Sequence, residues 1–240
     1  MEVKDMNNRE AGFSLIELMI SLAIFGIVLA GIVTLFTSTG RHHTGQEMMV
    51  EVAQNVRSTR NLMVDEIRSA GCNPKETGRM GFLTDSSDDR FDTDANSIHF
   101  TRDIDNGDGD AFYESDGDPD DPNEDIAYYR TQDEATCLNS AVVTPLPSGT
   151  PGILCRNTSG GDTTPGGGQP VMERVTALQF QYYDSAGISL VPPFSNSDLD
   201  QIKSVDVTIT GQVQNPNLVS TGNREWTQQF QILVRNSFGY

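Results

Sequence analysis

The sequence predicts an α+β protein in which one long N-terminal helix packs against an antiparallel sheet. Three observations carry this prediction: an apolar run near the N-terminus, a second segment with a helical apolar stripe, and alternating apolar and polar residues beyond residue 75. Helices and strands do not alternate along the chain. One helix comes first and the strands follow, which indicates α+β rather than α/β architecture.

The apolar run from Phe13 to Phe36 contains one charged residue, Glu17. Its 24 residues would form about 36 Å of helix, enough to cross the hydrocarbon core of a bilayer. A carboxylate inside such a helix is costly and therefore marks a functional site. Ser14 and Glu17 also have the spacing of a capping box, which would explain part of the role of the glutamate. The run is too long, and residues 1–12 are too polar, for an ordinary secretory signal.

The helix is predicted to continue beyond the hydrophobic segment 13–40 into an amphipathic segment, residues 41–74. Spacings of mostly three, four or seven residues give this segment one apolar stripe. The stripe consists of Met49, Val52, Val56, Met63, Ile67 and Ala70. Gly71 and Pro74 supply a stop signal. We expect the stripe to pack against the sheet of a globular head, residues 75–240.

The head contains short segments in which apolar and polar residues alternate, as in half-buried strands. The predicted strands are residues 97–101, 126–130, 153–156, 177–183, 204–213 and 227–235. Within 204–213, Val205, Val207 and Ile209 share one face, which suits an antiparallel sheet with one packed face. Residues 160–170 are glycine-rich and predict a flexible loop.

The N-terminal motif resembles that of type IV prepilins and type II secretion pseudopilins. The resemblance rests on Gly12, the following Phe13-Ser14-Leu15-Ile16-Glu17-Leu18-Met19 and the apolar helix. It implies that residues 1–12 are a leader, that a prepilin peptidase cuts between Gly12 and Phe13, and that Phe13 becomes N-methylated. It also implies that Glu17 pairs with the terminal amine of a neighbouring subunit during filament assembly. Charges buried in lipid or in a filament core are tolerable only when paired.

Parts of the head resemble PilW-like minor pilins and GspJ-like pseudopilins. These parts are residues 175–183, 202–209 and 230–236, and the end of the helix, residues 68–74, also resembles that of PilW-like minor pilins. The resemblance implies a pilin-like head and a minor pilin of a type IV pilus tip or initiation complex. Such a subunit has a single span in the bacterial inner membrane and its head in the periplasm before it enters the pilus. Other pilins would bind through the N-terminal helix. The alternatives are a minor pseudopilin of a type II secretion system and a membrane-anchored calcium-binding adhesin.

The charge of the chain argues against nucleic-acid binding. Its formal net charge is −18, and basic residues do not cluster in the head. The chain has three histidines and no nucleophile motif, so no catalytic triad is evident. We therefore expect a structural protein rather than an enzyme.

An acidic insert, residues 85–125, holds fourteen aspartates and two glutamates against two arginines. Its alternating aspartates resemble a calcium loop, in which a tight turn directs several carboxylates at one hard cation. The expected ligands are Asp103, Asp105, Asp108 and Asp110, with Asp116, Asp118, Asp120 and Glu124 as further ligands. The register departs from an EF-hand, because Gly107 and Asp108 stand in reversed order. The alternative is a solvated acidic loop.

The three cysteines, Cys72, Cys137 and Cys155, fit no zinc spacing. We expect a disulfide between Cys137 and Cys155, because both lie in the head, each beside a predicted strand. They enclose a loop rich in proline and glycine. Cys72 ends the helix and is expected to be free, although its pairing with either other cysteine stays open.

Overall fold

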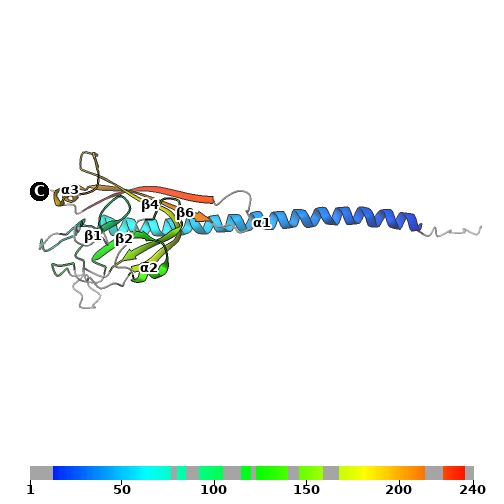
Figure 1. Cartoon of the computed structure of the whole chain (residues 1–240), viewed down its shortest axis with the longest axis horizontal. Coiled ribbons are helices and arrows are strands. Elements are labelled where there is room, and N and C mark those ends of the chain that lie inside the picture. Colours follow the sequence, from blue (N-terminus) through cyan, green and yellow to red (C-terminus); the bar gives the residue numbers. More distant parts are fainter. Residues whose placement is uncertain are drawn as a thin grey trace, which may run out of the picture. The chain divides into compact units, whose positions relative to one another are not determined.

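The computed structural model describes eight ranges of the chain. These are residues 13–76, 80–84, 92–104, 115–119, 123–139, 146–158, 168–213 and 224–235. The chain forms two compact units, Met1–Glu47 and Met48–Tyr240. Within these ranges, ten helices and strands follow one another along the sequence (Figure 1).

One long helix precedes all the strands. The helices are α1 (Leu15–Arg68), α2 (Glu134–Asn139) and α3 (Asn196–Gln201). The strands are β1 (Ile98–Thr101), β2 (Asp125–Thr131), β3 (Gly152–Asn157), β4 (Gly168–Tyr183), β5 (Ser189–Leu190), β6 (Ser204–Val213) and β7 (Arg224–Leu233). They form a seven-stranded antiparallel sheet in the order β1-β2-β3-β4-β6-β7, with β5 paired to β4. The predicted α+β, pilin-like fold is confirmed.

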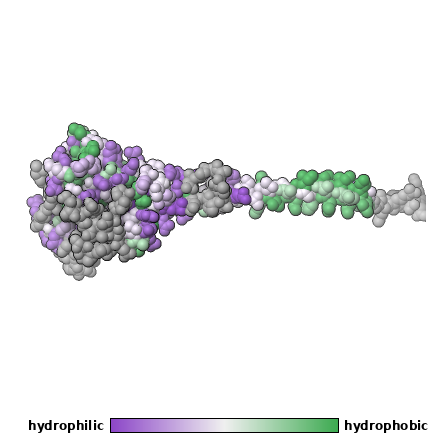
Figure 2. Space-filling model, viewed as in Figure 1, coloured by the Kyte–Doolittle hydropathy of each residue, from purple (hydrophilic) through white to green (hydrophobic). Residues whose placement is uncertain are grey.

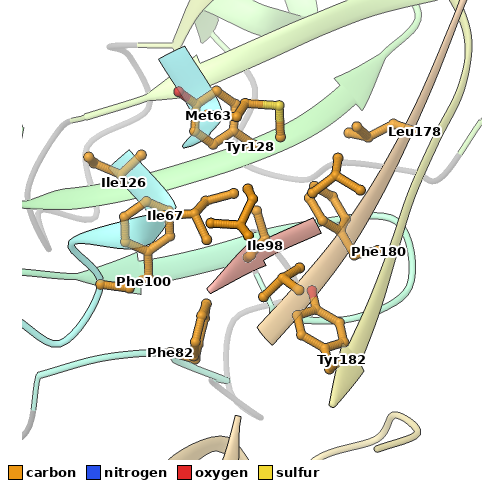
Figure 3. Packing of buried hydrophobic residues seen from close by; sticks show 14 of the residues in the cluster. Met63, Ile67, Phe82, Ile98, Phe100, Ile126, Tyr128, Leu178, Phe180 and Tyr182 are labelled. Atoms are coloured by element: carbon orange, nitrogen blue, oxygen red, sulfur yellow. The ribbon is translucent and has the colours of Figure 1, made fainter. Parts of the chain in front are cut away.

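The core of the second unit lies between the C-terminal part of α1 and one face of the sheet. Val56, Met63 and Ile67 of α1 are fully buried. Met63 and Ile67 lie among side chains from β1, β2 and β4 (Figure 3). The predicted apolar stripe therefore has the predicted partner, and burial of each such side chain contributes about 1.5–3 kcal/mol.

The two long central strands show why one face of the sheet is apolar. Their inward pairs are Leu178 with Ile209, Phe180 with Val207 and Tyr182 with Val205. The alternate positions, such as Gln179 and Thr208, face away from the core. Alternation with a period of two places every second residue on the packed face, so β6 lies exactly where its pattern predicts.

Gly211 of β6 allows α1 to approach the sheet closely. A Cβ atom at this position would lie 2.9 Å from Cγ1 of Val52 and would also meet the side chain of Met172. Such a distance is shorter than a normal carbon–carbon contact. A side chain here would therefore force the helix and the sheet apart.

Several boundaries differ from the sequence prediction. The predicted loop 160–170 is wrong at its end, because β4 begins at Gly168 and pairs with β3. The alternation in β4 is broken where Arg174 takes a positive φ of 59° and the register shifts between Val175 and Ala177. Strand β7 begins three residues earlier than predicted, at Arg224, because its pairing with β6 continues to that residue. The short elements α2, β5 and α3 were not predicted.

Candidate functional site

The N-terminal motif lies at the start of α1. The carbonyl of Ser14 accepts hydrogen bonds from the N–H groups of Glu17 at 3.0 Å and Leu18 at 3.1 Å, which closes the first helical turn. Among the described contacts, the side chains of Ser14 and Glu17 form no capping-box hydrogen bond. Glu17 is exposed on the surface of the helix. The described part of the chain therefore offers its carboxylate no partner.

The apolar side chains that follow Glu17 are exposed all round α1. Residues 13–36 hold large apolar side chains that nothing in the described structure covers, as Figure 2 shows along the helix. In the described residues, α1 is the one helix long and apolar enough to cross a membrane. Its hydroxyl groups bond to the helix itself: Ser21 Oγ donates to the Glu17 carbonyl at 2.7 Å, and Thr34 Oγ1 to the Ala30 carbonyl at 2.8 Å. Such internal bonds suit an apolar environment, where no water is available.

Comparison with known protein families identifies a known sequence motif at the start of α1. The model of the prokaryotic N-terminal methylation motif matches residues 7–33. The chain is prepilin-like. No curated protein and no solved structure matches it significantly. The predicted prepilin N-terminus is confirmed, and the matched segment includes Gly12, Phe13 and Glu17.

A second glutamate of α1, Glu66, has its partners within the chain itself. It is buried among side chains of the sheet. Arg156 of β3 donates through Nε to its Oε1 at 3.1 Å and Oε2 at 2.9 Å, and the Arg156 Nη2 also donates to Oε1. The hydroxyl of Tyr128 in β2 donates to Oε2, and the Arg102 guanidinium lies 3.8 Å from Oε1. This cluster joins the C-terminal part of α1 to the sheet.

The electrostatics of this cluster follow from burial and charge. Burial lowers the pKa of Arg156, but the hydrogen bonds and the charge of Glu66 outweigh this effect and raise it. Burial, with the charge of Glu66 added, raises the pKa of Tyr128 far above its ordinary value. The cluster thus favours a charged pair with a neutral tyrosine. The sequence analysis missed Glu66, although a signal was present: it lies three residues after Met63, on the predicted apolar stripe.

The cysteines of the head lie as the sequence suggested. Cys137 of α2 and Cys155 of β3 form a disulfide with a Cα–Cα distance of 5.8 Å, and Cys72 is free. The disulfide packs with Tyr129 in a small cluster separate from the main core. Burial, followed by the negative charge of Asp103, raises the pKa of the Cys72 thiol.

The structure separates the predicted calcium ligands into three groups. Asp105, Asp108, Asp110 and Asp120 lie outside the described residues. Asp116 and Asp118 are exposed, and the Asp118 N–H donates to Asp116 Oδ1 at 3.1 Å. Asp103 and Glu124 are buried. The described residues contain no group of three or more His, Cys, Asp or Glu side chains that could hold a metal.

No catalytic constellation is present in the part of the head that the structure describes. His99 Nε2 lies 2.6 Å from Asp125 Oδ1 across β1 and β2. A groove of about 360 Å³ lies on the outer face of β4 and β6. Glutamine, asparagine, serine, threonine and aliphatic side chains line most of it, with Asp206 as its one charged residue.

Proposed function

We propose that this prepilin is a minor pilin, a structural subunit of a type IV pilus tip or initiation complex. The observation that carries the proposal is the methylation motif on an apolar helix whose Glu17 has no partner in the described chain. A filament core supplies both what covers the apolar side chains and what pairs with the carboxylate. The sheet-and-helix head is the part that would distinguish this subunit from its neighbours.

The proposed maturation begins at the bond between Gly12 and Phe13. A prepilin peptidase cuts this bond and methylates the new terminal amine of Phe13. The apolar helix holds the subunit in the inner membrane before assembly, with the head in the periplasm. The Cys137–Cys155 disulfide supports this placement of the head, because disulfides persist in oxidising compartments.

The proposed role of Glu17 is to pair with the terminal amine of a neighbouring subunit. A carboxylate at the depth of the hydrocarbon core costs free energy unless an opposite charge neutralises it. The pairing therefore aligns two subunits along the filament axis by charge, while their apolar side chains supply contact area. Association would satisfy a carboxylate that the described chain leaves exposed.

Intact-mass measurement of the membrane-extracted protein tests the processing step. We expect a mature chain that begins at Phe13 and carries one extra methyl group, and an uncut chain in cells that lack prepilin peptidase. A mature chain that retains its leader in peptidase-positive cells would contradict the proposal and favour a membrane-anchored adhesin outside any filament.

Paired variants test the role of Glu17. We expect Glu17→Ala to insert into the membrane but to lose its co-purification with partner pilins. Ser14→Ala is the matched control, because it removes the other half of the capping-box pattern. If both variants lose partners equally, the glutamate acts in helix capping rather than in assembly.

The identity of the co-purifying subunits separates a pilus from a secretion system. The same N-terminal motif begins minor pseudopilins, so the motif itself favours both equally. We expect subunits of a type IV pilus to be captured by the cross-linked wild-type protein. Capture of type II secretion pseudopilins instead would reassign the subunit to a pseudopilus.

A further inference from the structure

Asp103 lies two residues after the end of β1, within the acidic insert, and is fully buried. Neither of its carboxylate oxygens has a hydrogen-bond donor among the residues that the structure describes. Its backbone N–H donates to the Cys72 carbonyl at 2.8 Å, which fixes Asp103 against the segment after α1. A buried carboxylate without donors is strongly unfavourable, so its position requires an explanation.

Glu124, the residue before β2, holds a second buried carboxylate at the same place. Its Oε1 accepts a hydrogen bond from the Ile104 N–H at 2.6 Å, and its backbone carbonyl accepts one from the Arg102 N–H at 2.9 Å. Arg102 and Ile104 are the two chain neighbours of Asp103, so these bonds hold Glu124 beside it. Two neighbouring carboxylates repel each other unless a cation or a proton intervenes.

The guanidinium of the preceding residue, Arg102, makes its described contacts with other residues than Asp103. Its Nε donates to the Asn123 carbonyl at 2.8 Å, and its Nη1 donates to Ser69 Oγ at 2.8 Å. Its ion pair is with Glu66, at 3.8 Å. In the described structure, no arginine or lysine forms an ion pair with Asp103. The positive charge that would balance this carboxylate must therefore come from another source.

We infer that Asp103 and Glu124 anchor a calcium site within the acidic insert, between the end of β1 and the start of β2. Calcium prefers carboxylate oxygens and tolerates irregular coordination, with water filling the remaining positions. The anchors lie near the two ends of the segment that joins β1 to β2, close to where these strands pair. The exposed Asp116 and Asp118 are not among them. The inference does not depend on the proposed role in a pilus.

A bound ion would join three segments that already meet at this point. The Gly71 N–H donates to the Thr101 carbonyl at 2.9 Å, and the Cys72 carbonyl accepts from the Asp103 N–H, so the segment after α1 lies beside the C-terminal end of β1. Glu124 adds the start of β2. Binding that occurs only in the folded state raises the midpoint of thermal unfolding.

The test uses the full-length protein in detergent, with calcium or with a chelator. Equilibrium dialysis counts the bound calcium, and fluorescence of the single tryptophan, Trp226, follows unfolding. We expect the wild-type midpoint to rise with calcium. Asp103→Asn should lose one tightly bound ion and most of this rise. In chelator it should melt above the wild type, because it removes an unpaired buried charge.

The double variant Asp116→Asn with Asp118→Asn is the matched control, because it removes two exposed charges from the same insert. It should keep the tight ion and the full rise. An equal loss of the bound ion and of the rise in midpoint in the control would show that calcium only screens the charges of the insert, and it would refute the proposed site. Absence of a tight ion in the wild type would also overturn it. If the Asp103→Asn variant shows no unfolding transition, the Glu124→Gln variant is measured in its place. A Glu124→Gln variant that still binds the tight calcium ion would refute the inference.

Discussion

Replacing Glu66 by glutamine tests the buried charge cluster between α1 and the sheet. Glutamine keeps the size of the side chain and its capacity to accept hydrogen bonds, but it removes the negative charge. The side chains of Glu66 and Arg156 are only 8% and 11% exposed, so water cannot replace the lost partner. Arg156 and Arg102 would then be buried as uncompensated charges.

We expect Glu66→Gln to lower the free energy of unfolding by about 3–5 kcal/mol, the usual cost of removing one partner from a buried ion pair. Asp65→Asn is the matched control, because Asp65 is the neighbouring acid on the same helix and is exposed. It should change stability by less than about 0.5 kcal/mol. Urea unfolding of the full-length protein in detergent, followed by Trp226 fluorescence, measures both values.

A double variant distinguishes the net contribution of the Glu66–Arg156 ion pair to stability from the cost of leaving one of its two charges buried without a partner. Replacing Glu66 and Arg156 together by leucine should recover much of the loss, because a buried pair exchanged for apolar residues is often neutral. A Glu66→Gln cost below about 1 kcal/mol would refute the reasoning, since that is the behaviour of an exposed ion pair. A double variant as unstable as the single one would show that shape, rather than charge, determines the site.

Two further predictions concern other buried groups. Replacing Cys137 and Cys155 by serine together should lower the free energy of unfolding by about 3 kcal/mol, because the bond closes a loop with a sequence separation of 18; urea unfolding checks this, and no loss would show that the bond is not formed. Burial raises the pKa of Tyr182 well above its ordinary value. The unfolded chain therefore releases this proton from about pH 10 while the folded chain keeps it, so stability falls by about 1.4 kcal/mol per pH unit above pH 10. Tyr182→Phe should flatten this slope in unfolding measured from about pH 8 to pH 11, and an unchanged slope would contradict the assignment.

The sequence predicts elements well where a single local pattern determines them. Strand β6 alternates over its whole length, and its predicted bounds of 204–213 match the structure. The first half of β4 does not alternate: it begins Gly-Gln-Pro and contains the positive φ of Arg174. That half is a strand because β3 pairs with it, and β3 lies elsewhere in the sequence. Pairing between distant segments cannot be read from local periodicity.

The candidate sites show the same limit. The N-terminal methylation motif is contiguous, so the sequence alone predicts it, and the family model matches it at residues 7–33. Glu66 and Arg156 are 90 residues apart, and only the fold brings them together. The sequence named Asp103 among many aspartates, but its burial depends on the contacts of the segment after α1 with β1. The alternating acidic residues predict that a cation binds in this segment. Only the structure indicates which of the carboxylates are buried and could hold it.

The two glutamates Glu17 and Glu66 belong to one helix but differ in where their partners come from. Glu66 lies in the amphipathic part, where the chain supplies two arginines and a tyrosine, so folding alone satisfies its charge. Glu17 lies among exposed apolar side chains, where the described chain supplies no partner. Substitution of Glu66 should therefore act on stability whether or not other subunits are present. Substitution of Glu17 should leave the folding of the head unchanged and act only when subunits associate. If the proposed role of Glu17 holds, one helix stabilises its own head through Glu66 and leaves Glu17 to pair with a neighbouring subunit.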